Sequence, residues 1–280
     1  MKYEDALYKS SAVFSAAGID EAHLEAELLL RHASGLTRAE LFRDLNLEIN
    51  EEALEKFKNS LKKRLSGVPS AYITGHREFF GIDYIVTPSV LIPRPETELL
   101  VETAISLINK YNYVDAADIG TGSGNIAVSL AVWCKKINIT AVDISKSALD
   151  IAYQNARKHS VDNRISFLQG NLCQPLNRVF DLICANLPYV TSGEVTSSNL
   201  LYYEPHLALD GGKDGLDIIR ELGASVFSYI KPGGSVLLEV GDNQAEDVLA
   251  CYLDNRPHIY SEVVRDLGGK QRLLHFRLTP

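Results

Sequence analysis

The chain has 280 residues, of which 46% are hydrophobic and 23% charged, and its formal net charge is −8. This is enough apolar material for a large core without disulfide or metal support. The acidic balance disfavours bulk duplex DNA as a partner. No stretch approaches the ~20 apolar residues of a membrane span, no signal peptide is visible, and no Cys-x-x-Cys pair occurs. We therefore expect a cytoplasmic protein with free thiols and no metal site.

Residues 1–70 are predicted to form a small bundle of helices. The clearest helix is Glu51–Leu65, with Asn50 as its N-cap and an apolar stripe at helical spacing. Thr37 and Glu40 stand three residues apart before an apolar pair, the pattern of a capping box. An earlier helix is expected over Glu21–Ala33.

Residues 71–90 have a different, aromatic and β-like texture. Gly75 and Gly81 are suitable turn points, so this segment is predicted to be a β-hairpin that links two domains. Beyond it, Pro95 would preset the first turn of a helix over Glu96–Lys110.

From residue 112 onward, strands and helices alternate, which predicts a parallel, doubly wound sheet. The final pair of strands has no helix between them, so we expect an antiparallel strand at the end of the sheet. The predicted strands are Val114–Ile119, Ile137–Val142, Ile165–Leu168, Phe180–Ala185, Ser235–Val240, Ile259–Arg265 and Arg272–Leu278; the predicted helices are Asn125–Cys134, Ser145–His159, Leu216–Ile230, stopped by Lys231–Gly234, and Gln244–Leu253.

A glycine-rich loop follows the first of these strands. Its glycines, Gly120, Gly122 and Gly124, allow a tight turn and the close approach of a ligand. The next strand ends at Asp143, whose carboxylate can accept both hydroxyls of a ribose. A dinucleotide fingerprint has the spacing G-x-G-x-x-G, which would require glycine at Asn125. The observed G-x-G-x-G suits S-adenosylmethionine, which we favour over NAD and over a plain structural turn.

The tetrapeptide Asn186-Leu187-Pro188-Tyr189 follows the fourth strand, at the carboxyl edge of the sheet beside the loop. Asn and Pro are also common turn residues, but this position favours catalysis. The Asn186 side-chain carbonyl and the Leu187 backbone carbonyl can each accept one N–H of a planar amide or amine, favouring the positive charge that develops on nitrogen. Pro188 would hold the loop, and Tyr189 would pack on the amide.

At these motifs the chain resembles the protein-(glutamine-N5) methyltransferases of peptide chain release factors, the HemK/PrmC family. The likeness covers nearly the whole chain and several blocks besides the loop and the tetrapeptide: Ala71–Gly75, Arg77–Phe79, Leu91–Glu98, Tyr203–Pro205, Leu207–Leu209, Gly211–Leu216, Asp266-Leu267 and Gln271-Arg272. The resemblance implies a class I methyltransferase fold, with a mostly parallel seven-stranded sheet over 91–280. It also implies that helical residues 1–70 help to recognise the release factor, whose substrate glutamine lies in a Gly-Gly-Gln loop.

The resemblance also assigns site residues. Those expected to contact S-adenosylmethionine are Gly120, Thr121, Gly122, Ser123, Gly124, Asp143, Asn171, Leu172 and Asn186, and those expected to hold and activate the glutamine are Asn186, Leu187, Pro188 and Tyr189. Three positions depart from the family pattern. Leu187 replaces a proline, which leaves the loop less preorganised, Asn171 replaces an acid, and Leu172 stands where an aromatic ring is common.

Other readings stay open. The glycine loop and the tetrapeptide also occur in adenine-N6 DNA methyltransferases, and a non-catalytic module could keep the cofactor fold. Arg94 could reach a ligand or make a structural contact. Glu98 is expected to make a helix-surface or hinge contact, and Glu204 to shape a lid loop in which His206 is not catalytic. We expect a monomer that acts on release factors, not directly on nucleic acid or a membrane.

Overall fold

The computed structural model describes residues 1–197, 202–254 and 256–279. The chain divides into two compact units, Met1–His76 and Arg77–Pro280. In the described residues, no helix is both long and apolar enough to cross a membrane.

The first unit is a helical bundle around a core that includes Phe14 and Leu29. Both predicted caps are present: Thr37 and Glu40 form a capping box, and Asn50 accepts a hydrogen bond from the Ala53 N–H at 2.8 Å. The helices are α1 (Tyr3–Ala16), α2 (Ala22–Ser34), α3 (Arg38–Arg43), α4 (Glu51–Leu65) and α5 (Ser70–Thr74). The expected β texture over residues 71–74 is therefore wrong, because α5 forms there and Gly75, in the left-handed region, ends it.

The predicted hairpin is shorter than the β-like texture suggested. Strands β1 (His76–Phe79) and β2 (Ile82–Ile85) pair. Phe80 and Gly81, with φ of 51° and 70°, join them. Positive φ at both turn residues matches the right-handed twist of the strands. Glycine accepts this geometry readily, but phenylalanine adopts it at a cost in strain.

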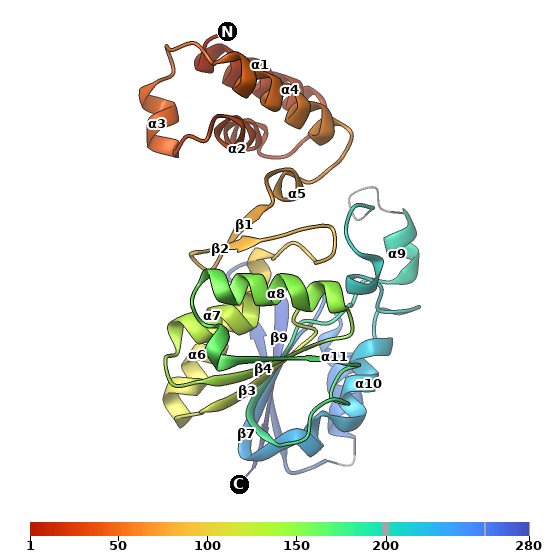
Figure 1. Ribbon diagram of the computed structural model, residues 1–280. Helices are drawn as coiled ribbons and strands as arrows, with labels where there is room; N and C mark the ends of the chain where they lie inside the picture. Colours follow the sequence, from red (N-terminus) through yellow and green to blue (C-terminus); the bar gives the residue numbers. More distant parts are fainter. Residues whose placement is uncertain (198–201, 255, 280) are drawn as a thin grey trace. The chain divides into compact units, whose positions relative to one another are not determined.

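The second unit contains the predicted doubly wound sheet (Figure 1). Its seven strands lie in the order β5-β4-β3-β6-β7-β9-β8, and β9 alone runs opposite to the others, so that its pairs with β7 and β8 are antiparallel. The bounds are β3 (Asp115–Ile119), β4 (Asn138–Asp143), β5 (Ile165–Gln169), β6 (Phe180–Ala185), β7 (Ile230–Glu239), β8 (Ile259–Arg265) and β9 (Gln271–Leu278). The antiparallel end of the sheet is confirmed.

Helices cover both faces of the sheet, α6, α7 and α8 on one and α10 and α11 on the other (Figure 1). Alternate residues of a strand belong to opposite cores: Ala116 and Cys184 pack on one side, Ala117 and Ile183 on the other. The helices are η1 (Pro95–Thr97), α6 (Glu98–Tyr111), α7 (Asn125–Trp133), α8 (Lys146–Lys158), η2 (Asp162–Arg164), α9 (Ser192–Ser197), η3 (His206–Ala208), α10 (Asp217–Ser225), η4 (Val226–Tyr229) and α11 (Ala245–Leu253).

Strand β7 begins five residues before the predicted position, at Ile230. The sequence Lys231-Pro232-Gly233-Gly234 was expected to be a helix stop, yet it lies inside the strand. Its extra residues form a bulge where the pairing with β6 shifts register between Phe180 and Leu182. The Tyr113 hydroxyl donates to the Gly233 carbonyl at 2.8 Å, which satisfies a backbone group that the bulge displaces.

Candidate active site

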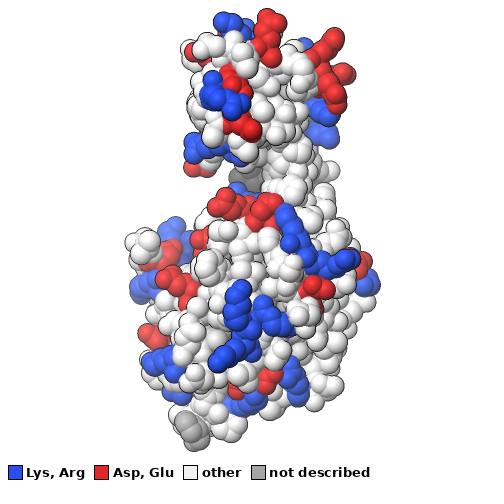
Figure 2. All heavy atoms as spheres, turned by 60° about the vertical axis from the view of Figure 1, so that its left-hand side comes forward, with Lys and Arg blue, Asp and Glu red and all other residues white. Residues whose placement is uncertain are grey.

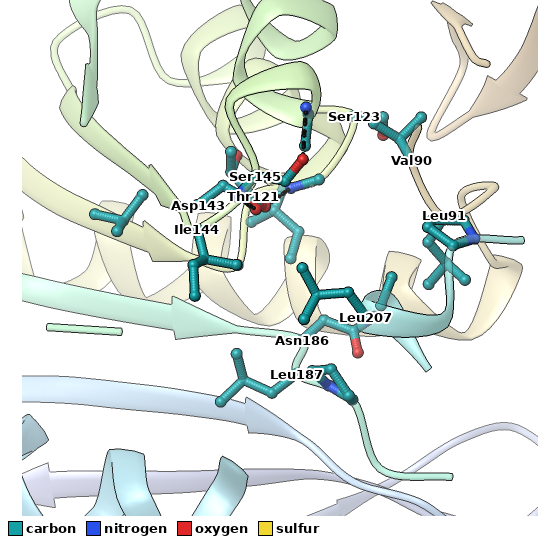
Figure 3. Close-up of a pocket in the computed structure, with 18 of the residues that line it drawn as sticks. Val90, Leu91, Thr121, Ser123, Asp143, Ile144, Ser145, Asn186, Leu187 and Leu207 are labelled. Atoms are coloured by element: carbon teal, nitrogen blue, oxygen red, sulfur yellow. Dashed lines mark hydrogen bonds between the residues drawn. The ribbon is translucent and has the colours of Figure 1, made fainter. Parts of the chain in front are cut away.

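A pocket lies at the carboxyl edge of β3, β4 and β6, where a doubly wound sheet binds its ligands. Residues from six segments line it: Ser89–Leu91, Pro93, Arg94 and Thr97; Gly120–Ser123, Asn125 and Ile126; Val142–Ser145 and Ala148; Gly170–Leu172; Asn186–Pro188; and Pro205, Leu207, Ala208, Asp210 and Ile218. Thr121 and Asp143 lie on one side of it, Asn186 and Leu187 lie across from them, and Leu207 reaches into the space between (Figure 3).

The three glycines of the loop serve different purposes. All have positive φ, which disfavours any side chain. A Cβ on Gly120 would stand 3.0 Å from Leu187 Cδ2, so glycine lets the loop approach the tetrapeptide. A Cβ on Gly124 would stand 3.0 Å from Ala152 Cβ. Gly124 therefore permits close packing of α7 on α8, and it is absent from the pocket lining, unlike the other predicted cofactor residues.

Asp118 stabilises the glycine loop through hydrogen bonds to the loop and to the start of α7. Its Oδ2 accepts from the Thr121 hydroxyl at 2.6 Å and from the Ala127 N–H at 3.2 Å. The side chain is fully buried, and burial raises the pKa of Asp118 to about 7 even though both hydrogen bonds lower it.

Asp143 stands at the end of β4 with both carboxylate oxygens in use. Oδ2 accepts from the Gly122 N–H and Oδ1 from the Ser145 N–H, each at 2.8 Å. Burial raises its pKa, while backbone N–H donors lower it. Because a carboxylate has about four acceptor positions, lone pairs remain for ligand hydroxyls, which fits the predicted ribose contact.

The tetrapeptide presents two acceptors beside the pocket. Asn186 Nδ2 donates to the Thr97 hydroxyl at 2.9 Å. Its Oδ1 accepts no hydrogen bond from a described residue, and neither does the Leu187 backbone carbonyl. Asn186, Leu187 and Pro188 all line the pocket, as the sequence predicted for the substrate site.

Tyr189 is not among the residues that line the pocket, and its packing on a substrate amide stays a prediction. Its hydroxyl points to Glu239 Oε1 at 3.5 Å, and burial, followed by the charge of Glu239, raises the pKa of Tyr189 to about 12. Its carbonyl accepts from Gln244 Nε2 at 3.0 Å. Any side chain on Gly215 would overlap that same carbonyl, so the glycine block after residue 210 packs on the tetrapeptide backbone.

Asn171 and Leu172 also line the pocket. Asn171 Nδ2 donates to Glu221 Oε1 at 2.7 Å, which leaves its side-chain carbonyl free to accept. Leu172 is buried with φ of 47°, a left-handed conformation that is strained for leucine. Its side chain is held at the wall although it cannot stack as an aromatic ring would.

Glu204, in the segment after the tetrapeptide, contacts the Leu91–Glu98 block. Arg94 pairs with Glu204, whose other oxygen accepts from the Ile92 N–H at 3.3 Å. This anchors Pro205 and Leu207 beside the pocket. Glu98 accepts from the Phe80 N–H at 2.8 Å, a contact between the start of α6 and the turn of the hairpin. His206 lies 3.7 Å from Asp210 and outside the lining. In the described part of the chain, no three His, Cys, Asp or Glu side chains gather as a metal site.

Sequence reasoning assigned no role to Thr97, Glu239 or Leu207. Thr97 was only part of a family block, and its link to Asn186 joins residues 89 positions apart. Glu239 did carry a signal, because a single acid in the apolar run from Val236 to Val240 is costly to bury without a purpose.

Comparisons with known proteins cover both units. A family profile described as the PrmC N-terminal domain matches residues 5–75, and one described as a methyltransferase small domain matches residues 95–202. The chain is 37% identical over 274 residues to a release factor glutamine methyltransferase of Moorella thermoacetica, covering 97% of each chain. It is 38% identical to that of Koribacter versatilis, covering 92% of each. A methyltransferase structure from Pyrococcus furiosus, 18% identical, matches 80% of this chain and 100% of its own with a TM-score of 0.53, a likeness of fold alone.

Proposed function

The chain belongs to the family of release factor glutamine methyltransferases, and from this premise we propose that it transfers a methyl group from S-adenosylmethionine to the side-chain amide nitrogen of the glutamine in the Gly-Gly-Gln loop of a release factor. The observation that carries the proposal at the site is a pair of unengaged acceptors, Asn186 Oδ1 and the Leu187 carbonyl, on residues that line the same pocket as Asp143.

The pocket suits an adenosyl amino acid. Asp143 keeps free lone pairs for the ribose hydroxyls, and Asn171 keeps a free amide carbonyl for an adenine amino group. Gly122 leaves open backbone where a ligand can approach. When bound, S-adenosylmethionine supplies an electrophilic methyl group on a sulfonium sulfur.

The tetrapeptide then acts on the glutamine. An amide nitrogen is a poor nucleophile because its lone pair is delocalised into the carbonyl. Asn186 Oδ1 and the Leu187 carbonyl each accept one N–H, so they orient the nitrogen and favour the positive charge that it gains. The buried, apolar side chain of Leu187 excludes water from its side of the pocket. As the methyl–sulfur bond breaks, the neutral thioether leaves, and the positively charged nitrogen is acidic enough to lose its proton to water without a protein base.

Adenine in nucleic acid is the alternative substrate, because it also presents a planar NH2 group. Duplex binding relies on phosphate contacts from Lys and Arg. The chain carries 28 Lys and Arg against 36 Asp and Glu, and on the face in Figure 2 a group of basic side chains on the second unit is surrounded by acidic ones. The net negative charge favours the protein substrate.

The test uses labelled S-adenosylmethionine with three substrates: a release factor, its variant with the Gly-Gly-Gln glutamine changed to alanine, and adenine-containing DNA. We expect label on the release factor only, and none on its variant. Label on DNA alone would establish the alternative, and cofactor binding with no label on any substrate would indicate a non-catalytic module. A substrate from the translation machinery places the reaction in the cytoplasm, and we propose that the enzyme works as a monomer.

A further inference from the structure

The Asn186 side-chain amide can point either its oxygen or its nitrogen toward the pocket, and only the oxygen suits the substrate. Oδ1 can accept an N–H from the glutamine amide. Nδ2 is itself a donor, so it cannot bind the NH2 group of the glutamine. The contact from Nδ2 to the Thr97 hydroxyl at 2.9 Å holds the first orientation. A hydroxyl can donate or accept, so Thr97 by itself would tolerate either.

Glu239 removes this ambiguity. It lies at the end of β7 with 2% of its surface exposed, and the hydroxyl of Thr97, 1% exposed, acts on its carboxyl group and lowers its pKa. An ionised carboxylate only accepts. An ionised Glu239 therefore favours a Thr97 hydroxyl whose hydrogen is directed toward the carboxylate, which leaves Thr97 a lone pair to accept from the Asn186 amide.

The same carboxyl contacts the other end of the tetrapeptide. The Tyr189 hydroxyl donates to Glu239 Oε1 at 3.5 Å. Oε2 is buried, and no described residue offers it a hydrogen bond. A buried carboxyl that is only partly satisfied costs stability, so its position beneath both Asn186 and Tyr189 calls for a functional explanation.

We propose that Glu239 is a positioning residue for methyl transfer: through Thr97 it fixes the Asn186 amide with Oδ1 toward the substrate, and it anchors Tyr189 directly. This inference rests on the proposed function and adds that turnover depends on a carboxylate that touches neither substrate nor cofactor.

The charge of Glu239 should then control turnover. Burial raises its pKa to about 7; Glu96 of η1 raises it further, whereas Thr97, Arg272 of β9 and Tyr189 lower it. Arg94 and Glu96 also act on Tyr189. A neutral carboxyl can donate to Thr97 and reverse the chain of hydrogen bonds. At saturating cofactor, kcat should therefore rise with pH through about 7.

The experiment compares Thr97→Val, Thr97→Ser and Glu239→Gln with the wild type, measuring kcat and KM on a release factor from pH 6 to 9 and cofactor Kd by calorimetry. Thr103→Val is the matched control, because it makes the same substitution on α6, where the Thr103 hydroxyl donates only to the Leu99 carbonyl. We expect Thr97→Val and Glu239→Gln to lower kcat about tenfold at pH 8 and to flatten its pH profile. Thr97→Ser and Thr103→Val should keep the wild-type kcat at pH 8 and the wild-type pH profile of kcat.

The outcomes separate this inference from the proposed function. A wild type that leaves the release factor unmethylated refutes the function. An active wild type whose Thr97→Val variant keeps its kcat and its pH profile refutes the positioning role alone. Loss of cofactor affinity in step with kcat would assign Thr97 to pocket packing and also overturn the role. Asp118 has a pKa in the same range, but its titration would persist in Thr97→Val, so a flattened profile points to Glu239.

Discussion

At the scale of single residues, the two polar atoms of the Asn186 side-chain amide have different roles: one makes a structural hydrogen bond, and the other is left for the substrate that we propose. Asn186 uses Nδ2 for Thr97 and leaves Oδ1 to the pocket. Leu187 achieves the same division through its backbone, since its side chain packs near Gly120 while its carbonyl stays free. The leucine that replaces the family proline therefore retains the backbone acceptor that we propose binds the substrate amide.

Removing the Asn186 side chain tests its assignment to the substrate. We expect Asn186→Ala to lower kcat by about 10²-fold or more, the size of effect seen when one preorganised polar contact to a transition state is lost. The cofactor Kd, measured by calorimetry, should change little. Asn163→Ala, at an exposed asparagine of η2, should leave both values unchanged. A parallel loss of cofactor affinity in Asn186→Ala would move this residue to the cofactor site.

The buried carboxyl of Glu239 also predicts how stability depends on pH. Because its pKa is about 7 in the folded protein against 4.5 ordinarily, the folded state favours the proton, and its stabilising effect is complete below pH 4.5. Stability is lost as pH rises toward 7, by about 3 kcal/mol. Glu239→Gln cannot titrate, so its Tm relative to wild type should rise by about 5–10 °C between pH 4.5 and 8.

Thermal unfolding at matched pH values measures this difference. Other titrating groups, Asp118 among them, are shared by the two proteins and cancel. A constant gap in Tm across the range would show that Glu239 ionises in the folded state as it does in water.

At the scale of elements, α8 joins the hairpin to the glycine loop through a single side chain. Asn155 is fully buried. Its Oδ1 accepts from the Ile85 N–H at 2.7 Å, and its Nδ2 donates to the carbonyls of Ile85 and Ser123, each at 2.9 Å. One asparagine therefore holds the edge of β2 and the turn of the cofactor loop in fixed relation to a helix.

We expect Asn155→Ala to lower the free energy of unfolding by about 2–4 kcal/mol, because it leaves one buried and two partly buried backbone groups unpaired. Cofactor affinity should fall as well, since Ser123 loses its anchor. Urea denaturation and calorimetry measure the two effects. Asn138→Ala, at an exposed position opening β4, should change stability by less than about 0.5 kcal/mol. Equal effects of the two substitutions would contradict the anchoring role.

At the scale of the whole molecule, the pocket is built entirely from residues of the second unit. The first unit has its own core and its own capped helices. Chemistry can therefore reside in one unit while residues 1–70 recognise the release factor, which is the division that we propose.

A fragment comprising residues 77–280 tests this division. We expect it to fold, to bind S-adenosylmethionine with the Kd of the full chain and to methylate a short Gly-Gly-Gln peptide equally well. Its kcat/KM on an intact release factor should fall by at least about tenfold, corresponding to some 1.4 kcal/mol of lost recognition. Steady-state kinetics of the fragment and of the full chain, each with the peptide and with the intact release factor, measures this difference. Undiminished activity on the intact release factor would exclude a recognition role for the first unit.

The sequence by itself determined the order and type of most elements, because hydrophobic periodicity and caps act over a few residues. The capping box at Thr37, the cap at Asn50 and the strand Phe180–Ala185 all lie where local signals put them. The adjacency of the loop, Asp143 and Asn186 also followed from sequence, since carboxyl ends of parallel strands share an edge.

Tertiary structure decided what depends on contacts between distant residues. Lys231–Gly234 has the composition of a helix stop, but pairing with β6 absorbs it as a bulge. Gly124 matches the cofactor motif, but its space is taken by Ala152 of α8. The direction of the Asn186 amide was equally hidden, because it depends on how a hydroxyl and a carboxyl from two other elements pack beneath it. Local sequence patterns do not determine these features, because they depend on contacts that form only when distant segments pack together.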